Sequence, residues 1–218
     1  MNLSPTRFAI AIDGPAASGK STLARELAKR LGLVMVNSGA MYRAVTWKAL
    51  KEGIPVEDDA KVITLLNSIT LQCGDDGILS TIAVDGIDPG DELRSEAVNS
   101  NVSAVSAIPA VREKLVALQR DYLNRTSIVM EGRDIGSVVF PDSPYKIYVT
   151  ACEKTRAARR KIVGEVDSVA DRDAADSARL TAPLKIADGA TVLDTTHHTI
   201  ESGVLAALEI LKHQGLSI

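Results

Sequence analysis

The sequence predicts an α/β protein in which a five-stranded parallel sheet lies between layers of helices, a three-layer arrangement. Three observations carry this prediction. Short apolar runs alternate with helical patterns, a glycine-rich turn joins the first run to the first helix, and the connections are short. Such units favour right-handed crossovers and therefore parallel strand pairing. One stretch breaks the rhythm and predicts a small antiparallel β insert.

The N-terminal part supplies two predicted strands and two predicted helices. The apolar run 8–12 ends at a glycine-rich turn, after which leucines recur at helical spacing until Gly32 gives a stop signal. A second apolar run covers residues 33–36. Asn37 and Ser38 are typical of a helix cap, and the helix they predict covers residues 40–52.

The antiparallel insert is predicted from residues 69–72 and 80–84, which alternate in polarity and are separated by a Gly-Asp-Asp-Gly turn. Two helices follow, one from about residue 95 and one from 109 to 122. Further strands are expected at residues 127–130, 145–150 and 191–193, and a helical pattern follows each of the last two.

Composition excludes several classes of protein. The 218 residues are 45% hydrophobic and 24% charged, with a formal net charge of -3, so no basic field favours nucleic acid or an anionic membrane. No apolar run is long enough to span a bilayer, and the N-terminus has no secretory pattern. Cys73 and Cys152 lack metal-type or redox-type spacing, which favours a cytoplasmic protein.

The glycine-rich turn matches the phosphate-binding P-loop pattern G-x-x-x-x-G-K-[ST], and it lies between an apolar strand and a helix as that motif requires. Its backbone N–H groups and the helix N-terminus attract phosphate, while the lysine can reach the outer phosphates and the serine hydroxyl can ligate Mg²⁺. The motif predicts a site for a nucleoside triphosphate. The expected cofactor-binding residues are Gly14, Pro15, Ala16, Ala17, Ser18, Gly19, Lys20, Ser21 and Thr22, with Ser21 as the metal ligand.

Arginines spread over several segments narrow the reaction class. An enzyme that transfers a phosphoryl group must gather positive charge around many phosphate oxygens, and the planar guanidinium suits that task. Such arginines follow the second strand, open a helix, follow the strand at 127–130 and cluster on a later helix; they are Arg43, Arg112, Arg133, Arg156, Arg159, Arg160, Arg172 and Arg179.

The order of the motifs resembles the bacterial cytidylate kinases, within the nucleoside monophosphate kinases. The segments that carry the resemblance are IAIDGPAASGKST, NSGAMYR, VSAVSAIPAVR, EGRDIGSVVFPD, RAARR and RDAADSARLTAPLKIADGATVLDT. The resemblance implies phosphorylation of CMP and dCMP by ATP with Mg²⁺, and a cytoplasmic enzyme that acts as a monomer without nucleic acid or membrane.

The resemblance also implies a role for each charged segment. The residues implied to hold the acceptor phosphate are Ser38, Arg43, Arg133 and Arg179; Ser103, Arg112 and Asp134 are implied to read cytosine, and Arg172 and Asp176 to contact the ribose. The implied catalytic residues are Lys20, Arg133, Arg156, Arg160 and Arg179. Glu131 has no such role and is expected either to orient Arg133 or to cap its strand.

The expected division of the chain follows from the same resemblance. A kinase core would comprise residues 1–62 and 97–218, with a β-rich acceptor-side insert at 63–96 and a lid around 156–172. Only eleven residues separate Arg160 from Arg172, which makes this lid short.

Two other functions fit the P-loop alone. One is a kinase of a small metabolite, of the shikimate or gluconate type, which leaves the β insert and the Arg-Asp pairs unexplained. The other is a P-loop switch or ATPase that acts through a partner; it should carry an Asp-x-x-Gly after a strand, and the run Asp134-Ile135-Gly136 has the wrong spacing.

Overall fold

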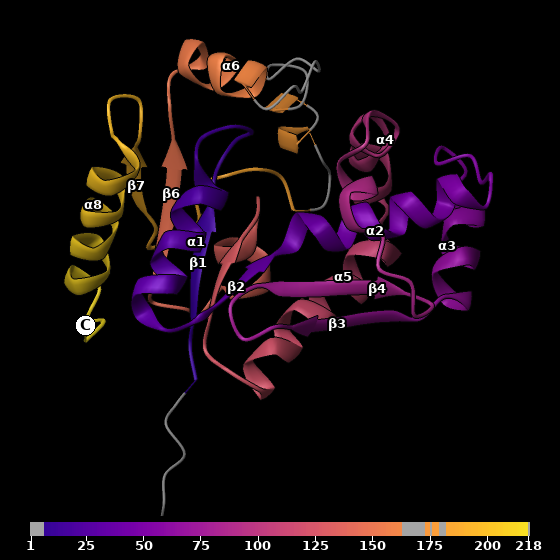
Figure 1. Cartoon of the computed structure of the whole chain (residues 1–218), viewed down its shortest axis with the longest axis horizontal. Coiled ribbons are helices and arrows are strands. Elements are labelled where there is room, and N and C mark those ends of the chain that lie inside the picture. The colour runs from indigo at the N-terminus through magenta and orange to yellow at the C-terminus, as the bar shows by residue number, and fades with distance from the viewer. Residues whose placement is uncertain (1–6, 163–172, 175, 179–181, 218) are drawn as a thin grey trace, which may run out of the picture.

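The computed structural model describes residues 7–162, 173–174, 176–178 and 182–217. Within these ranges the strands form a five-stranded parallel sheet in the order β2-β5-β1-β6-β7 and a separate antiparallel pair, β3-β4. This confirms the predicted fold class (Figure 1). The strands are β1 (Ala9–Asp13), β2 (Val34–Asn37), β3 (Leu71–Asp75), β4 (Ser80–Val84), β5 (Ile128–Glu131), β6 (Lys146–Thr150) and β7 (Thr191–Asp194).

Helices and short helical turns fill the connections, and α6 lies above the sheet in Figure 1. The longer ones are α1 (Lys20–Leu31), α2 (Ser38–Lys51), α3 (Asp59–Ser68), α4 (Glu96–Ala107), α5 (Pro109–Asp121), α6 (Glu153–Ile162) and α8 (Ile200–His213). The short ones are two 3₁₀ turns, η1 (Gly90–Arg94) and η2 (Tyr122–Asn124), and a π-helical turn, η3 (Ile135–Val139).

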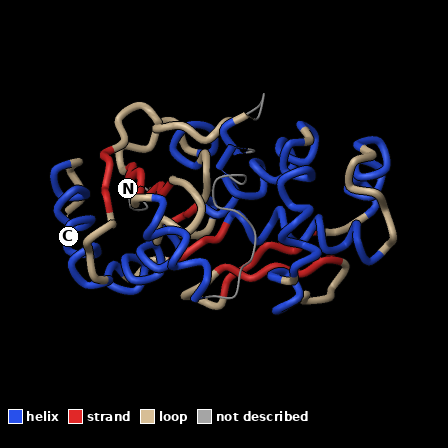
Figure 2. Tube along the Cα trace, turned by 90° about the horizontal axis from the view of Figure 1, so that it is seen from above, coloured by secondary structure: helices blue, strands red, loops and turns tan. Residues whose placement is uncertain are grey.

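The central strand shows why the sheet needs two covering layers. Ile10 and Ile12 of β1 pack in a cluster with residues of α1 and α8, whereas Ala9 and Ala11 pack in another with residues from 122 to 140. Alternate side chains of a strand point to opposite faces, so both faces of β1 are buried. Figure 2 looks down on the molecule and shows the helices, in blue, around the red strands.

A third apolar cluster lies beside the sheet and is built from α2, α3, α4, α5 and β4. We call this part, residues 38–121, the acceptor-side half, because it contains the insert at 63–96 for which the resemblance implies an acceptor-side position. Met35 at the edge of the main sheet donates its N–H to the carbonyl of Ile78 at 2.8 Å, which joins the β3-β4 hairpin to β2. The hairpin and α3 extend to one end of the molecule in Figure 1.

Local sequence explains where α2 and α3 begin. The side chain of Asn37 accepts from the N–H of Ala40 and that of Asp58 from the N–H of Lys61, so both are N-caps. The cap at Asn37 was predicted, although the helix begins at Ser38 rather than at residue 40. Helix α3 was not predicted, and the proposed domain boundary between residues 62 and 63 falls inside it.

Candidate active site

A cleft of about 970 Å³ lies at the carboxyl ends of the parallel strands and extends between the sheet and the acceptor-side half. Its walls come from segments that follow β1, β2, β5 and β7, and from η1, α4, α5 and α6. This is where open α/β sheets bind ligands. The predicted site residues that line it are Ala16, Ala17, Gly19, Lys20, Ser21, Thr22, Ser38, Arg43, Ser103, Arg112, Arg133, Asp134, Arg160 and Asp176.

Of the predicted residues that the structure describes, four do not belong to the lining: Gly14, Pro15, Ser18 and Arg156. Gly14 supports the loop from behind, because a Cβ there would lie 2.0 Å from the carbonyl oxygen of Val149. Its φ of 145° also favours glycine. No larger residue fits between the phosphate loop, residues 14–21, and β6.

The lysine of the phosphate loop is held against the loop itself. Lys20 is 4% exposed, and its Nζ donates to the carbonyl of Pro15 at 2.5 Å. Burial, and then the nearby charge of Arg133, lowers the pKa of Lys20 to about 7. A phosphate bound in the loop would favour the charged ammonium and would therefore raise the pKa of Lys20.

Glu131 occupies a position that neither expectation foresaw. Its Oε1 accepts a hydrogen bond of 3.0 Å from the hydroxyl of Ser21, and its side chain is buried at the end of β5. Its main-chain carbonyl accepts from the hydroxyl of Ser38 at 2.8 Å. Glu131 therefore joins the phosphate loop to the start of α2.

The oxygen donors of Ser21 and Glu131 suit Mg²⁺, which binds oxygen ligands and retains several waters or phosphate oxygens. Among the residues that the structure describes, no group of three or more His, Cys, Asp or Glu side chains could hold a metal by itself. A metal here would take one or two protein ligands and complete its shell from the nucleotide and water.

Arg112 and Asp134 form an ion pair in the wall of the cleft that faces the phosphate loop, and each is only 5% exposed. Arg112 also donates to the carbonyl of Ser106 at 3.2 Å, and its guanidinium lies 5.5 Å from the centre of the Tyr42 ring. The two charged residues come from α5 and from the turn after β5. Together they present guanidinium donors beside a carboxylate acceptor.

Arg133 pairs with Asp176, with 2.6 Å between Nε and Oδ2. Burial opposes the charge of Arg133, but the negative charge of Asp176 keeps the pKa of this arginine above its usual value. Asp176 itself is 3% exposed. The neighbouring residues Arg133 and Asp134 thus face different partners from one turn.

Two glycines allow side chains of this wall to lie close to the backbone. A Cβ on Gly132 would lie 2.6 Å from the Ser38 hydroxyl, and a Cβ on Gly39 would lie 2.9 Å from Nη1 of Arg43. Arg43 in turn donates to the side chain of Asn99 at 3.3 Å.

Helix α6 brings arginines to the other side of the phosphate loop. Arg156 donates to the carbonyl of Ala16 at 3.1 Å and pairs with Asp173, whose carboxylate accepts from the N–H of Ala16 at 2.9 Å. Arg160 is buried and lines the cleft.

Arg159 was named among the arginines of the sequence but was given no role in the expected site. Its Nη1 and Nη2 donate to the hydroxyl and the carbonyl of Thr195 at 3.0 and 2.9 Å. The Thr195 hydroxyl then donates to the carbonyl of Ser18 at 2.8 Å, which supports the phosphate loop from β7. The spacing R-x-x-R-R contained the signal for Arg159, whereas Thr195 ended a segment that carried the resemblance but was given no role.

Arg172 and Arg179, which were expected to bind ribose and phosphate, lie outside the described residues. In the described part of the chain, no helix is long and apolar enough to cross a membrane.

Comparison with known proteins places this architecture in a family. The family model described as cytidylate kinase matches residues 10–213. A cytidylate kinase of Caldanaerobacter subterraneus subsp. tengcongensis is 41% identical over 214 residues, covering 93% of this chain and 94% of the relative. One of Geobacillus kaustophilus is 39% identical, covering 95% of this chain and 98% of the relative.

Fold comparison agrees at lower identity. A protein of solved structure from Thermus thermophilus superposes with a TM-score of 0.53 at 16% identity, over 97% of this chain and 99% of that one. At this identity the match speaks for the fold only. From the family model and the relatives together, the chain belongs to the cytidylate kinase family.

Proposed function

We propose that this chain transfers the γ-phosphoryl group of ATP to CMP and dCMP and releases CDP and dCDP. The observation that carries the proposal is the Arg112–Asp134 pair, which lies in the same cleft as the phosphate loop. A nucleotide-binding loop alone fits many reactions. A buried pair of a hydrogen-bond donor and a hydrogen-bond acceptor in the same cleft favours one particular substrate as the recipient of the phosphoryl group.

The chemistry of the base explains why this pair favours cytosine. The exocyclic amine of cytosine donates a hydrogen bond, which the carboxylate of Asp134 can accept, while the guanidinium of Arg112 can donate to O2 and N3. Uracil presents a carbonyl in place of that amine. Two acceptors would then face each other in a buried site, and sites that leave a buried polar group unpaired discriminate strongly.

The remaining residues are proposed to hold the acceptor's phosphate and ribose. Arg133, Arg43 and the Ser38 hydroxyl would bind the phosphate together with Arg179, and Asp176 with Arg172 would bind the ribose hydroxyls. Ser103, on the α4 wall of the cleft, would assist Arg112 in reading the base. The support is that the described members of this set line one cleft.

On the donor side, Lys20 and the N–H groups of the phosphate loop would hold the ATP phosphates. Arg156 and Arg160 of α6 would place positive charge near the oxygens on which negative charge builds up during transfer. The acceptor phosphate is already anionic near neutral pH, so the proposed reaction requires no general base from the protein. Positioning and charge then account for catalysis.

Mg²⁺ is proposed as the metal cofactor, with the Ser21 hydroxyl as its protein ligand and Glu131 beside that hydroxyl. When bound with ATP, the ion would neutralise phosphate charge and orient the transferred group. We further propose that the enzyme acts as a cytoplasmic monomer and binds neither nucleic acid nor membrane. The proposed division into a core, an insert at 63–96 and a short lid around 156–172 completes the picture.

A panel of acceptors tests the proposed function. ADP formation would be followed in a coupled assay with Mg·ATP and, in turn, CMP, dCMP, UMP, AMP, gluconate, shikimate or no acceptor. We expect turnover with CMP and dCMP and much weaker turnover with UMP and AMP. Turnover with a small metabolite in place of CMP would favour the metabolite kinase, and ATP hydrolysis that no acceptor alters would favour the switch or ATPase.

A variant makes the same test at one residue. Arg133→Ala should reduce kcat/KM for CMP about 10²–10³-fold, on the scale of losing one preorganised donor of positive charge. Circular dichroism would establish that the variant is folded. Unchanged turnover would remove Arg133 from the proposed site.

A further inference from the structure

Asp13, the last residue of β1, contacts the acceptor-binding turn directly. Its two carboxylate oxygens accept from two consecutive backbone N–H groups, those of Ile135 and Gly136, each at 2.7 Å. Asp13 is 4% exposed. Both oxygens of one buried carboxylate are thus used to fix two adjacent peptide groups.

The peptides that Asp13 holds come immediately after Arg133 and Asp134. They open the π-helical turn η3, and the side chain of Asp134, which stands at its N-cap position, makes no capping bond. Asp13 satisfies these N–H groups instead, from another strand. The backbone direction at Asp134 therefore depends on a residue of β1.

Space around Gly136 is matched to this contact. A Cβ at Gly136 would lie 3.3 Å from Oδ2 of Asp13 and 3.2 Å from Cδ of Lys146. A side chain at this position would force the carboxylate or its neighbours to shift by a few tenths of an ångström. The turn and the carboxylate are therefore fitted to each other.

On its other side, Asp13 is bonded to the phosphate loop through the chain, since Gly14 follows it. The parallel ladder between β1 and β5 runs up to Asp13, because the N–H of Gly132 donates to the carbonyl of Ile12 at 3.0 Å. One residue thus stands between the loop that binds the donor and the turn that carries Arg133 and Asp134.

We propose that Asp13 is a positioning residue: by accepting hydrogen bonds from the N–H groups of Ile135 and Gly136, it sets where Asp134 contacts the base of the acceptor. The inference rests on the proposed function, since it assumes that Asp134 reads cytosine. Loss of these two hydrogen bonds should let the Asp134 carboxylate shift relative to the base. Base discrimination should then suffer more than folding or ATP binding.

The test replaces Asp13 by Asn, which keeps the size but offers one oxygen where there were two. For Asp13→Asn we expect the ratio of kcat/KM for CMP to that for UMP to fall at least about tenfold, as for one imperfect polar contact to a base. The KM for CMP should rise more than the KM for ATP. A purely structural role would lower the midpoint of thermal unfolding without changing the CMP-to-UMP ratio.

A second variant approaches the contact from the turn. Gly136→Ala would press a methyl group against the Asp13 carboxylate, and it should give the same fall in discrimination. It decides the question if Asp13→Asn does not fold. Ser143→Ala is the matched control, because Ser143 also binds β1, at the carbonyl of Ala9 and 2.6 Å away, but at the opposite end of the strand. We expect its CMP-to-UMP ratio to equal that of the wild type.

The outcomes separate the two proposals. If the wild-type protein does not phosphorylate CMP, the proposed function fails. If it does, and both Asp13→Asn and Gly136→Ala keep the wild-type ratio, the role of Asp13 is wrong while the function stands. An equal rise of the KM for CMP and the KM for ATP, with the ratio unchanged, would also overturn it.

Discussion

The phosphate-loop wall of the cleft comes from one short run, residues 14–22. The facing wall, which we call the acceptor wall after its proposed role, takes its charged side chains from α2, α5, the turn after β5 and Asp176. The first wall is built from consecutive residues, and local geometry such as the positive φ of Gly14 and Gly19 fixes their backbone. In the second wall, side chains far apart in sequence meet and hold one another as ion pairs.

The difference teaches where each wall is vulnerable. The loop depends on single positions that accept no side chain. Lys20 is the one charged residue in the run 14–22, so no neighbouring residue of the run can replace its charge. The facing wall depends on pairs, so removing one member leaves its partner without compensation in a buried place. Substitutions on the first wall should therefore affect turnover with any acceptor, and those on the second should affect the choice of acceptor.

The largest expected effect tests the phosphate-loop wall. Lys20→Met should reduce kcat about 10³-fold with CMP and with any other acceptor alike, because a buried charge aimed at the phosphates is lost. Steady-state kinetics over the acceptor panel measures it. Lys29→Met, on the exposed last turn of the same helix, is the control and should keep wild-type turnover. A loss confined to CMP would contradict the contrast between the walls.

The second effect concerns Asp13, which lies between the walls. Burial raises its pKa from 3.8 to about 6, against the bonds from Gly136 and Ile135; Asp134 raises it further and Lys20 lowers it. Between pH 4 and 6 the folded protein then binds a proton that the unfolded chain has released, so stability falls as the pH rises through this window.

Asp13→Asn removes that titration. The free energy of unfolding of the wild type minus that of the variant should therefore fall by up to about 3 kcal/mol between pH 4 and pH 7, at 1.36 kcal/mol for each unit of pKa. Urea unfolding at both pH values gives the difference. A constant difference would mean that Asp13 titrates alike in the folded and unfolded states.

The third effect tests the acceptor wall. Asp134→Asn places an amide where the carboxylate was, which can donate to the carbonyl of uracil. We expect the preference for CMP over UMP to fall by about 1–3 kcal/mol, or roughly 5- to 150-fold, since one base contact is worth about that much. Competition assays with mixed CMP and UMP measure it. Asp121→Asn, at the far end of α5, serves as the control; equal loss in both variants would refute base reading by Asp134.

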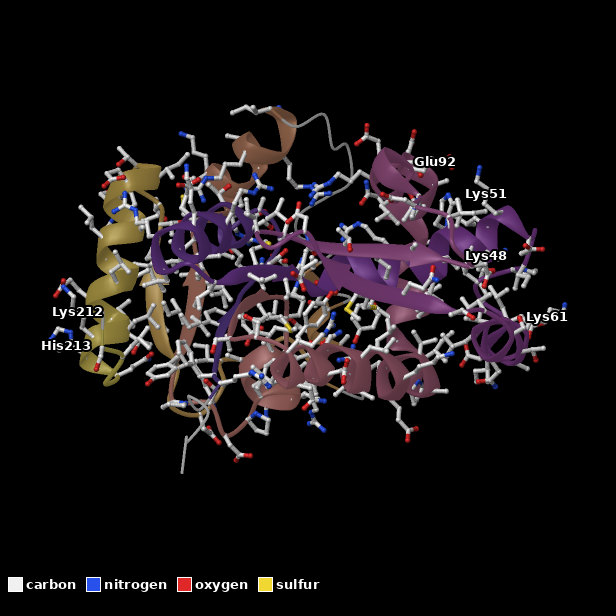
Figure 3. All side chains as sticks on the ribbon, turned by 60° about the horizontal axis from the view of Figure 1, so that its bottom comes forward. Lys48, Lys51, Lys61, Glu92, Lys212 and His213 are labelled. Atoms are coloured by element: carbon white, nitrogen blue, oxygen red, sulfur yellow. The ribbon has the colours of Figure 1, made fainter. Side chains whose placement is uncertain are left out.

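The smallest effect lies at the rim of the acceptor wall. Glu92 accepts from the Trp47 indole at 2.9 Å and pairs with Lys51 at 2.9 Å, which ties η1 to α2; Glu92 and Lys51 are labelled near each other in Figure 3. Because this contact is exposed, Glu92→Gln should raise the KM for CMP only about twofold and leave the KM for ATP unchanged. Lys61→Gln, farther along the same half, should change neither; a larger effect on the KM for ATP would argue against this assignment of the walls.

The sheet strands and the phosphate loop could be predicted from sequence because their signals are local. Apolar runs of strand length marked the strands, and eight consecutive residues contain the whole loop motif. Helix α3 was not predicted, although Val62, Leu65 and Leu66 are spaced for one buried face. The alternating β pattern that follows it was assigned to an insert beginning at residue 63, and that assignment included most of the helix.

Pairings between distant residues could not be predicted in the same way. The sequence contains Arg112, Asp134 and Asp176 but not which of them meet, because that depends on how α5 packs against the turn after β5. The π-helical turn η3 was missed for a related reason: the carboxylate that holds its first N–H groups comes from Asp13, more than a hundred residues earlier. The proposed roles of these residues stay predictions until the variants are measured.

The paired arginines of the acceptor wall also affect how the empty enzyme behaves among other anions. Arg112 and Arg133 each have a built-in counter-ion, Asp134 and Asp176. We therefore expect these two cations to attract inorganic phosphate or polyanions less than exposed arginines would, and their affinity for substrate to depend less on ionic strength. The two carboxylates should thus weaken competition by other anions at this wall.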